Sequence, residues 1–423
     1  MKLYQNNRFQ LNEFNIISLF FLLLPIGLVT GPFIPDLIVS LGSLYFIFIF
    51  YKKKLFKIIT SKIVICMILF NLYLVIRSLY SENIMLSLES ALFYFRFSFF
   101  VLLIIYVILL NENIIKYFKF SLLITIIVIL FDGYYQFFTG YNLLGYGAHN
   151  YSTNTLRFSG MFGDEMVLGK FLLHIVPLYI ALSFYKKTSI KLVYTNTLLI
   201  IVTLILIFLS GERTSFFLFL ILSLLFFIFT DLKKIILPSV FIIFLLLVLT
   251  TLMNPRVQER VFQTTFNELY NEKGEIHFIT VAHQNHAITA FKMFLDNPLF
   301  GQGPKMFREK CSELKYNSGI HSCSTHPHNY YLQLLAELGL IGVIPIIFIF
   351  AMMIYFLLIY AKKMWFDANT NKSNYEIGLI IIILTSLFPL APGMNFFNNW
   401  VSILLYLPLP FLLFPYFRLL YMH

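Results

Sequence analysis

The stretch Ser324-Thr-His-Pro-His-Asn-Tyr-Tyr-Leu-Gln-Leu-Leu-Ala-Glu-Leu-Gly-Leu-Ile-Gly342 joins a histidine-rich polar turn to the start of an apolar helix. It follows the only long hydrophilic part of the sequence, and the apolar run 332–360 is long enough to cross a bilayer. Histidine has the side chain whose unperturbed pKa lies nearest neutral pH, which suits it to proton transfer. A plain helix cap in an interfacial turn is the alternative interpretation of the same residues.

Composition indicates an integral membrane protein. Of the 423 residues, 59% are hydrophobic and only 12% are charged, whereas a soluble domain carries about 25% charged residues. The net charge of +11 does not indicate nucleic-acid binding, because the lysines lie in short clusters between apolar runs. Such clusters, here at 52–57, 116–119, 186–191, 233–234 and 362–363, are typical of cytoplasmic loops in a multi-pass membrane protein.

Apolar runs of roughly 17–25 residues can cross the hydrocarbon core, and runs of about this length predict an all-α membrane protein with about 12 transmembrane helices. The lysine clusters place both termini in the cytoplasm. The first run leads into Gly31-Pro32 rather than a small-residue cleavage site, so we expect an uncleaved helix and not a signal peptide. The expected spans are 16–30, 36–51, 62–80, 91–110, 120–138, 166–184, 192–210, 215–230, 235–253, 332–360, 375–391 and 400–417.

This topology gathers four polar segments on the extracytoplasmic side: Thr139–Glu165, Ser210–Thr214, Asn254–Asn329 and Pro392–Asn399. The third is about 75 residues long, and a loop of that length is usually functional. Within it, Val281–Leu295 has apolar residues at helical spacing, which predicts an amphipathic helix. We therefore expect the chemistry outside the cytoplasm.

The chain divides into three sections on this interpretation. Residues 1–153 supply five N-terminal helices, 154–360 form a core that contains the long loop 254–329, and 361–423 supply the last two helices.

Two arginines lie at the expected outer surface, Arg157 before the sixth span and Arg213 between the seventh and eighth. Arginine is always charged and binds phosphate through two parallel hydrogen bonds, which lysine cannot imitate. Both are candidates for holding a diphosphate. The alternative is that each one contacts lipid headgroups or pairs with a nearby acid, Glu212 or Asp164.

Arg96 lies inside an apolar span, where a charge is costly and normally faces a cavity or a partner. It is therefore expected either to join the diphosphate site or to form a buried ion pair.

Six histidines fall in the long loop, and a zinc site from four of them, His283, His286, His326 and His328, is conceivable. Their spacing matches no metalloenzyme pattern, so we expect neither a metal nor another cofactor. Cys311 and Cys323 lie in the same loop, and an extracytoplasmic compartment favours disulfides, so we expect them to pair.

With these residues in place, the chain resembles the bacterial O-antigen ligase and polymerase superfamily, whose members are polytopic inner-membrane glycosyltransferases. Four motifs carry the resemblance in the expected order. They are Arg157-x-Ser-Gly-x-Phe, Ser-Gly-x-Arg213-Thr, Asp296-x-Pro-x-x-Gly-x-Gly and His328-Asn-x-x-Leu-Gln-x-x-x-Glu-x-Gly-x-x-Gly. In one departure, His283 stands where such proteins often have an arginine, with Arg256 or Arg260 as substitutes for a third phosphate contact.

The resemblance implies a fold similar to the GT-C class and a metal-independent, inverting transfer on the periplasmic side of the inner membrane. The donor would be an undecaprenyl-diphosphate-linked glycan, and the acceptor either lipid A-core or a growing glycan. His328 would be the catalytic residue, and Arg157, Arg213 and Arg96 would bind the diphosphate. The supporting residues would be Glu165, Glu212, His326, Asn329, His283 and His286.

Ligation to lipid A-core and polymerisation of repeat units differ only in the acceptor, and the sequence favours the ligase slightly. A lipid-linked oligosaccharide flippase or transporter would also have many spans and basic inner loops. Transporters tend to have repeated halves and polar sites at the membrane midplane, whereas this chain concentrates its polar residues in one outer loop. The enzyme interpretation is therefore preferred.

Overall fold

The computed structural model describes residues 8–150, 156–186, 189–253, 255–259, 280–366 and 374–422. These residues form an all-α polytopic membrane protein, with one minimal strand pair, β1 (His149–Asn150) and β2 (Leu156–Arg157). The longer helices are α1 (Arg8–Gly27), α2 (Phe33–Lys52), α3 (Lys62–Leu79), α5 (Phe95–Leu110), α6 (Asn113–Thr139), α7 (Leu168–Ser183), α8 (Ile190–Leu209), α9 (Arg213–Phe229), α10 (Ile236–Met253), α13 (Val281–Asp296), α15 (Tyr330–Phe366), α16 (Asn374–Ser386) and α18 (Leu409–Met422). The shorter elements are η1 (Phe56–Ile58), α4 (Ile84–Ala91), η2 (Gly160–Phe162), η3 (Asp231–Ile235), α11 (Pro255–Gln258), α14 (Met306–Lys310) and α17 (Asn399–Tyr406).

Each expected span falls on one of these helices or on the bent pair α17–α18. Within the described residues, 7 helices are long and apolar enough to cross a membrane, and the pair α17–α18, bent by 46°, would make up to 8. The helical parts of α1, α7, α9 and α16 that pass as apolar are 10–17 residues long. An α-helix rises about 1.5 Å per residue, so α7, α9 and α16, with 16, 17 and 13 residues, are shorter than the roughly 30 Å hydrocarbon core. Multi-pass insertion is therefore shown, while the count of twelve is not.

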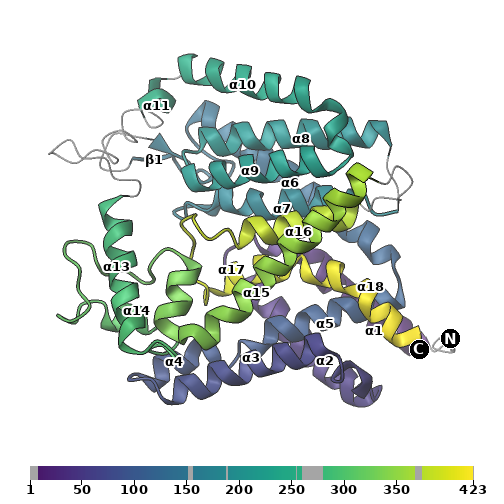
Figure 1. The fold of residues 1–423 in the computed structure, drawn as a ribbon. Coiled ribbons are helices and arrows are strands. Elements are labelled where there is room, and N and C mark those ends of the chain that lie inside the picture. Colours follow the sequence, from purple (N-terminus) through teal and green to yellow (C-terminus); the bar gives the residue numbers. More distant parts are fainter. Residues whose placement is uncertain are drawn as a thin grey trace.

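The helices lie side by side in one bundle (Figure 1). Helix α7 packs against α6, α8 and α16, and almost every one of its side chains is buried. Helix α10 lies at the edge of the bundle and is mostly exposed, as expected of a helix that faces lipid. Helix α13 confirms the amphipathic helix expected within the long loop.

Different polar contacts lie at the two ends of the helix bundle. At one end, Glu112 accepts hydrogen bonds from Tyr185 (2.9 Å) and Arg418 (2.7 Å), close to the turns that carry the lysine clusters. At the other end, Gly169 bonds to Glu212 and Gly393 bonds to His328. This second end, which we call the loop end, brings together the polar segments around residues 160, 212, 328 and 393. In Figure 1 the loop-end helices α13 and α14 lie opposite both chain termini.

A bend in α15 fixes the loop end. Gly339 interrupts the helix with φ 64°, ψ −163°, which frees nearby backbone groups from their usual partners. The segment 298–303 supplies replacements: Gln302 N bonds to Ala336 O (2.8 Å), Gly303 N to Glu337 O (2.7 Å) and Leu340 N to Pro298 O (2.9 Å). The Asp296-x-Pro-x-x-Gly-x-Gly motif therefore forms a backbone clamp on this bend.

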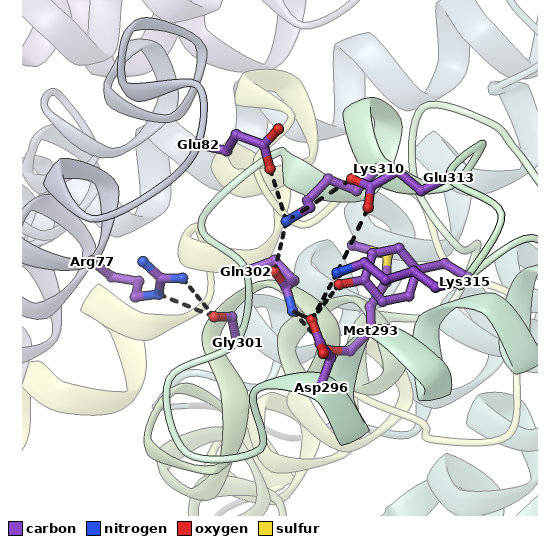
Figure 2. Close-up of polar contacts among 10 residues, drawn as sticks. Arg77, Glu82, Met293, Asp296, Gly301, Gln302, Lys310, Glu313 and Lys315 are labelled. Carbon is purple, nitrogen blue, oxygen red and sulfur yellow. Dashed lines mark hydrogen bonds and ion pairs between the residues drawn. The ribbon is translucent and has the colours of Figure 1, made fainter.

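Two glycines allow the clamp to close. A Cβ on Gly301 would lie 2.5 Å from the Glu337 carbonyl carbon, and one on Gly339 would lie 2.4 Å from Leu299 O. Arg77 of α3 contacts the clamp from the other side: its Nη2 donates a hydrogen bond to Gly301 O at 2.6 Å. Figure 2 shows this arginine reaching the Gly301 carbonyl.

Side chains fasten the clamp to the rest of the loop (Figure 2). Asp296 accepts hydrogen bonds from Tyr316, from Lys315 (3.2 Å) and from Gln302 (3.4 Å). Lys310 bonds to Gln302 Oε1 (3.0 Å) and forms an ion pair with Glu82 (2.9 Å), which precedes α4. The Asp296 carboxylate thus holds residues 315 and 316 against the clamp. The hydrogen bond from Tyr316, and then that from Lys315, lowers the pKa of Asp296.

We expect Gly339→Ala to destabilise the fold strongly, because the new methyl group would collide with backbone that cannot move away. Gly140→Ala is the matched control: Gly140 also has a positive φ (+85°), but nothing lies within 4 Å of its added Cβ. The control should cost only the backbone strain, about 1 kcal/mol. Thermal unfolding in detergent compares the two, and equal melting temperatures would contradict the clamp.

Candidate active site

Four histidines meet at the loop end. His283 and His286 lie on α13, while His326 and His328 precede α15. The ring centroid of His328 lies 4.2 Å from that of His326, 5.2 Å from His286 and 5.4 Å from His283. The structure therefore brings together four side chains that are separated by up to 45 positions in the sequence; we call them the histidine cluster.

Hydrogen bonds distinguish His326 from His328. The Nε2 of His326 faces the Gly393 carbonyl oxygen (3.3 Å), and its Nδ1 faces the Thr325 hydroxyl (2.9 Å). A carbonyl can only accept, so Nε2 carries the proton and Nδ1 accepts from Thr325. Both ring nitrogens of His326 are thus engaged. The ring nitrogens of His328 make no hydrogen bond to the described residues, and this imidazole is partly exposed.

The backbone holds His328 in an unusual conformation. Its φ of 54° lies in the left-handed region, which non-glycine residues seldom adopt. The Gly393 N–H donates to the His328 carbonyl at 2.7 Å and stabilises this turn. The next residue, Asn329, bonds to Pro389 O (2.7 Å) and accepts from the N–H groups of Tyr331 and Leu332. Asn329 is therefore the helix cap, and His328 is left to point into the site.

Burial and neighbouring charges favour the neutral form of three of these histidines, His286, His326 and His328. Burial lowers the pKa of His328 to about 4, with further lowering from His283, His286 and Lys170. Burial also lowers the pKa of His326 to about 3, helped by His328, Lys170 and Arg308. The pKa of His286 is lowered, first by burial and then by His283. At neutral pH the imidazole of His328 is unprotonated, as a proton acceptor must be.

Glu212 organises the second part of the site. It is buried, and its carboxylate accepts hydrogen bonds from Gly169 N (2.6 Å), Lys170 N (3.2 Å) and Ser215 Oγ (3.0 Å). It thereby caps the N-terminus of α7, where a negative charge is favourable. Arg157 acts electrostatically on the same carboxylate, and Arg213 follows it directly at the start of α9.

Lys170 links the two parts of the site. Its charge acts on Glu212 and also on both His326 and His328. Lys170 thus acts on Glu212, as Arg157 does, and on the two histidines. Sequence reasoning missed Lys170, because it lies within an apolar helix and outside the quoted motifs.

Arg308 was also missed. It lies on α14, between Phe307, whose ring is 6.4 Å from that of His286, and the disulfide-bonded Cys311. Its charge acts on His326 and on Glu337. Its positive charge, between the Asp296 and His328 motifs, was the available signal. Several lysines lie in the same segment, so nothing in the sequence selected Arg308 over them.

Arg96 forms the buried pair that was one of its two expected roles. Its Nη2 lies 2.9 Å from Asp36 Oδ1, and its Nε donates to the same oxygen at 3.0 Å. The guanidinium joins the N-terminal ends of α5 and α2. This contact favours a structural pair over a diphosphate contact for Arg96.

Glu165 lies apart from the histidine cluster. It is exposed and lines a cavity of about 920 Å³, with Trp400, Met394 and apolar residues of α1 and α6. Arg260 lies outside the described residues, as does the side chain of Arg256. Among the described residues, no group of three or more His, Cys, Asp or Glu side chains is arranged to hold a metal ion.

The expected disulfide is present. Cys311 and Cys323 are bonded, with their Cα atoms 5.2 Å apart and a sequence separation of 12. The bond ties α14 to the segment before His326, and the Cys323 backbone faces His286. It therefore holds Arg308 and the histidine cluster in one loop structure.

Residues 198–347 match the family model described as O-antigen ligase. This match supports the resemblance to the O-antigen ligase and polymerase superfamily. The matched segment contains Arg213, the histidine cluster and Arg308, whereas Arg157 and Lys170 lie before it. No curated protein matches the chain. The O-antigen ligase match indicates activity of the ligase or polymerase type, as the sequence motifs suggested.

We expect the disulfide to stabilise the loop that carries His328. The variant C311S/C323S should lose on the order of 3 kcal/mol of unfolding free energy, as loop-closure entropy predicts for a loop of this size. In denatured, unreduced protein, an alkylating reagent should label only Cys66, whereas reduction should expose all 3 cysteines. Mass spectrometry showing three labelled cysteines before reduction would contradict the bond.

Proposed function

We propose that the protein transfers a glycan from undecaprenyl diphosphate to an acceptor hydroxyl, with O-antigen ligation preferred and polymerisation of repeat units as the alternative. The observation that carries the proposal is the convergence of a neutral, accessible His328 with the cations around Glu212, through Lys170. A base and an anion-binding group are the two things that such a transfer needs. The ligase match supports this reaction class.

In the proposed reaction, the acceptor oxygen attacks the anomeric carbon while His328 takes the hydroxyl proton. The bond between the anomeric carbon and the diphosphate oxygen breaks, and undecaprenyl diphosphate leaves with the electron pair. Attack opposite the leaving group inverts the anomeric centre. Negative charge grows on the diphosphate, and Arg157 and Arg213 stabilise it without a metal, because preorganised cations act where the charge develops.

The other predicted residues support these two roles. Glu212 holds the start of α7, and Lys170 and Arg157 act on its carboxylate. His326, His283 and His286 surround His328, while Asn329 fixes the turn. Glu165 is proposed as a contact for the acceptor, since it lines the large cavity.

We propose that the loop end faces the periplasm and that both termini are cytoplasmic, in the bacterial inner membrane. The disulfide at the loop end supports this orientation, because disulfides persist in oxidising compartments. The lysine-rich turns at the other end support it too.

Replacing His328 with Ala should lower glycan transfer by about 10²–10⁴-fold, the usual contribution of a general base. The matched control is His321→Ala, since His321 is exposed and also has a positive φ (60°). Transfer is measured with purified protein, lipid-linked donor and acceptor, at equal protein levels. Near-normal transfer by H328A would remove His328 from the catalytic role.

Replacing Arg157 or Arg213 with Lys retains the charge but loses the paired hydrogen bonds. A hydrogen bond to a charged group contributes about 1.5–3 kcal/mol, so kcat/KM should fall roughly ten- to hundredfold. Arg418→Lys at the opposite end, where Arg418 binds Glu112, is the control. If all three variants match the wild type, the two arginines do not bind the diphosphate.

The pH profile should report the depressed pKa of His328. Transfer requires the neutral imidazole. As the pH is lowered from 7, kcat/KM should therefore stay constant at first and reach half of its value at a pH of about 4. An unperturbed histidine would give this fall near about 6.5. His283, His286, His326 and Lys170 are the titratable or charged groups that face it. A half-fall near pH 6.5, with the protein folded, would contradict the assignment.

A further inference from the structure

We propose that Gln333 of α15, together with Asn395, is a positioning residue that locks the turn 393–396 and thereby fixes His326 and His328. The inference rests on the proposed function, because that function gives His328 its role in proton transfer. It deepens that function by naming the side chains that hold the base in place. Gln333 lies in the His328 motif, and Asn395 follows it 62 positions later.

The backbone conformation of His328 requires a support. His328 has a φ of 54°, and its carbonyl oxygen accepts a hydrogen bond from Gly393 N at 2.7 Å. The Gly393 carbonyl oxygen faces Nε2 of His326 at 3.3 Å. A residue other than glycine stays in the left-handed region only where its surroundings hold it there. Gly393 therefore sets the backbone of one histidine and the ring tautomer of the other, so the position of its turn matters to both.

Gln333 holds this turn with both polar atoms of its buried amide. Its Oε1 accepts a hydrogen bond from Phe396 N at 2.9 Å. Its Nε2 donates to Asn395 Oδ1 at 2.8 Å and to Glu337 Oε2 at 3.1 Å. Asn395 Oδ1 also accepts from Phe397 N at 2.9 Å, so it is an oxygen, and the Gln333 group that faces it must be the donor. One side chain therefore binds two consecutive residues of the turn.

The same amide connects the turn to the other side of the histidine cluster. The Glu337 carboxylate accepts from Gln333 through Oε2 and from Phe307 N through Oε1, the latter at 3.2 Å. The ring centroids of Phe307 and His286 lie 6.4 Å apart. A chain of hydrogen bonds therefore runs from the turn through Gln333 and Glu337 to α14. Buried networks whose members are satisfied are rigid, and Gln333 is the member that joins the two sides.

Aromatic packing anchors the apolar side of the turn separately. Phe396 is buried, and its ring centroid lies 6.0 Å from that of Tyr94 and 6.1 Å from that of Tyr330. These ring contacts do not use the Gln333 amide. Loss of the amide should therefore release the polar side of the turn, which carries Gly393, while the helix bundle stays folded.

Kinetics of near-isosteric variants test the positioning role. Gln333→Met removes the hydrogen bonds of the amide, and Asn395→Leu removes the acceptor in the turn. In both variants kcat should fall roughly 10–10²-fold, the cost of displacing a reacting group by about 1 Å, while the KM for the lipid donor changes little. Asn395→Asp keeps the acceptor oxygen and should retain most of the wild-type kcat. The control is Asn196→Leu, because Asn196 is a buried amide that bonds to Ser183 at the far end of α7; its kcat should match the wild type.

Diethylpyrocarbonate, which reacts with unprotonated imidazole nitrogens, probes the turn without any substrate. His326 is buried and both of its ring nitrogens are engaged, so it should be protected in the wild type, whereas exposed His321 should react readily. Release of the turn frees this imidazole, and modification of His326 should become about tenfold faster in both variants. His174 on α7 is similarly buried and should stay protected, which shows that the protein is folded. Peptide mass spectrometry assigns each modified site.

The positioning role and the proposed function can fail separately. Wild-type kcat in both Q333M and N395L would overturn the positioning role, as would wild-type protection of His326. Loss of protection at His174 as well would mean that the network supports the whole fold and not this turn, which also overturns it. If H328A leaves transfer unchanged while His326 loses its protection in both variants, the function fails and the locked turn stands. If H328A abolishes transfer while Q333M and N395L keep the wild-type kcat, the positioning role fails and the function stands.

Discussion

The backbone clamp on the bend of α15 is the constraint on which the loop end depends. The helix that follows His328 can only bend at Gly339 because segment 298–303 supplies hydrogen-bond partners for the interrupted turn. That segment in turn carries α13 before it and α14 after it. One set of backbone bonds therefore fixes the helices that bear His283, His286 and Arg308 relative to the turn that bears His328. The glycines of two separate motifs are required on opposite sides of a single contact.

The site has an uneven charge distribution, and this distribution explains its chemistry. Burial favours the neutral form of His286, His326 and His328. Arg157, Lys170 and Arg308 bring positive charge from β2, α7 and α14. Glu212 is the acid that bonds at the start of α7. In the proposed function, this positive charge attracts the anionic donor and His328 is the uncharged base beside it. This arrangement can separate the two requirements of glycosyl transfer, which are leaving-group stabilisation and proton removal.

Much of this arrangement could be predicted from sequence, since hydrophobic length and lysine clusters determine how a chain lies in a membrane. The helical segments, α13 and the Cys311–Cys323 pair follow from such local signals. Span number could not be settled, because α7 and α16 are shorter than their apolar runs suggested. Arg96 shows a different limit: a charge in an apolar span demands a partner, but sequence does not say that the partner is Asp36. Lys170 and Arg308 were missed because their role depends on which helices meet, and no local pattern encodes that.

The site uses more of the chain than the family match covers. Arg157 and Lys170 precede residue 198, and Gly393 follows residue 347. Gly393 bonds to both His326 and His328, so the last section of the chain holds the turn that the matched segment only begins. Glu212, inside the match, caps α7, which lies outside it. The three sections proposed from sequence are therefore not independent units at this site. The matched segment supplies His328, and the orientation of His328 and part of its charged environment come from the flanking segments.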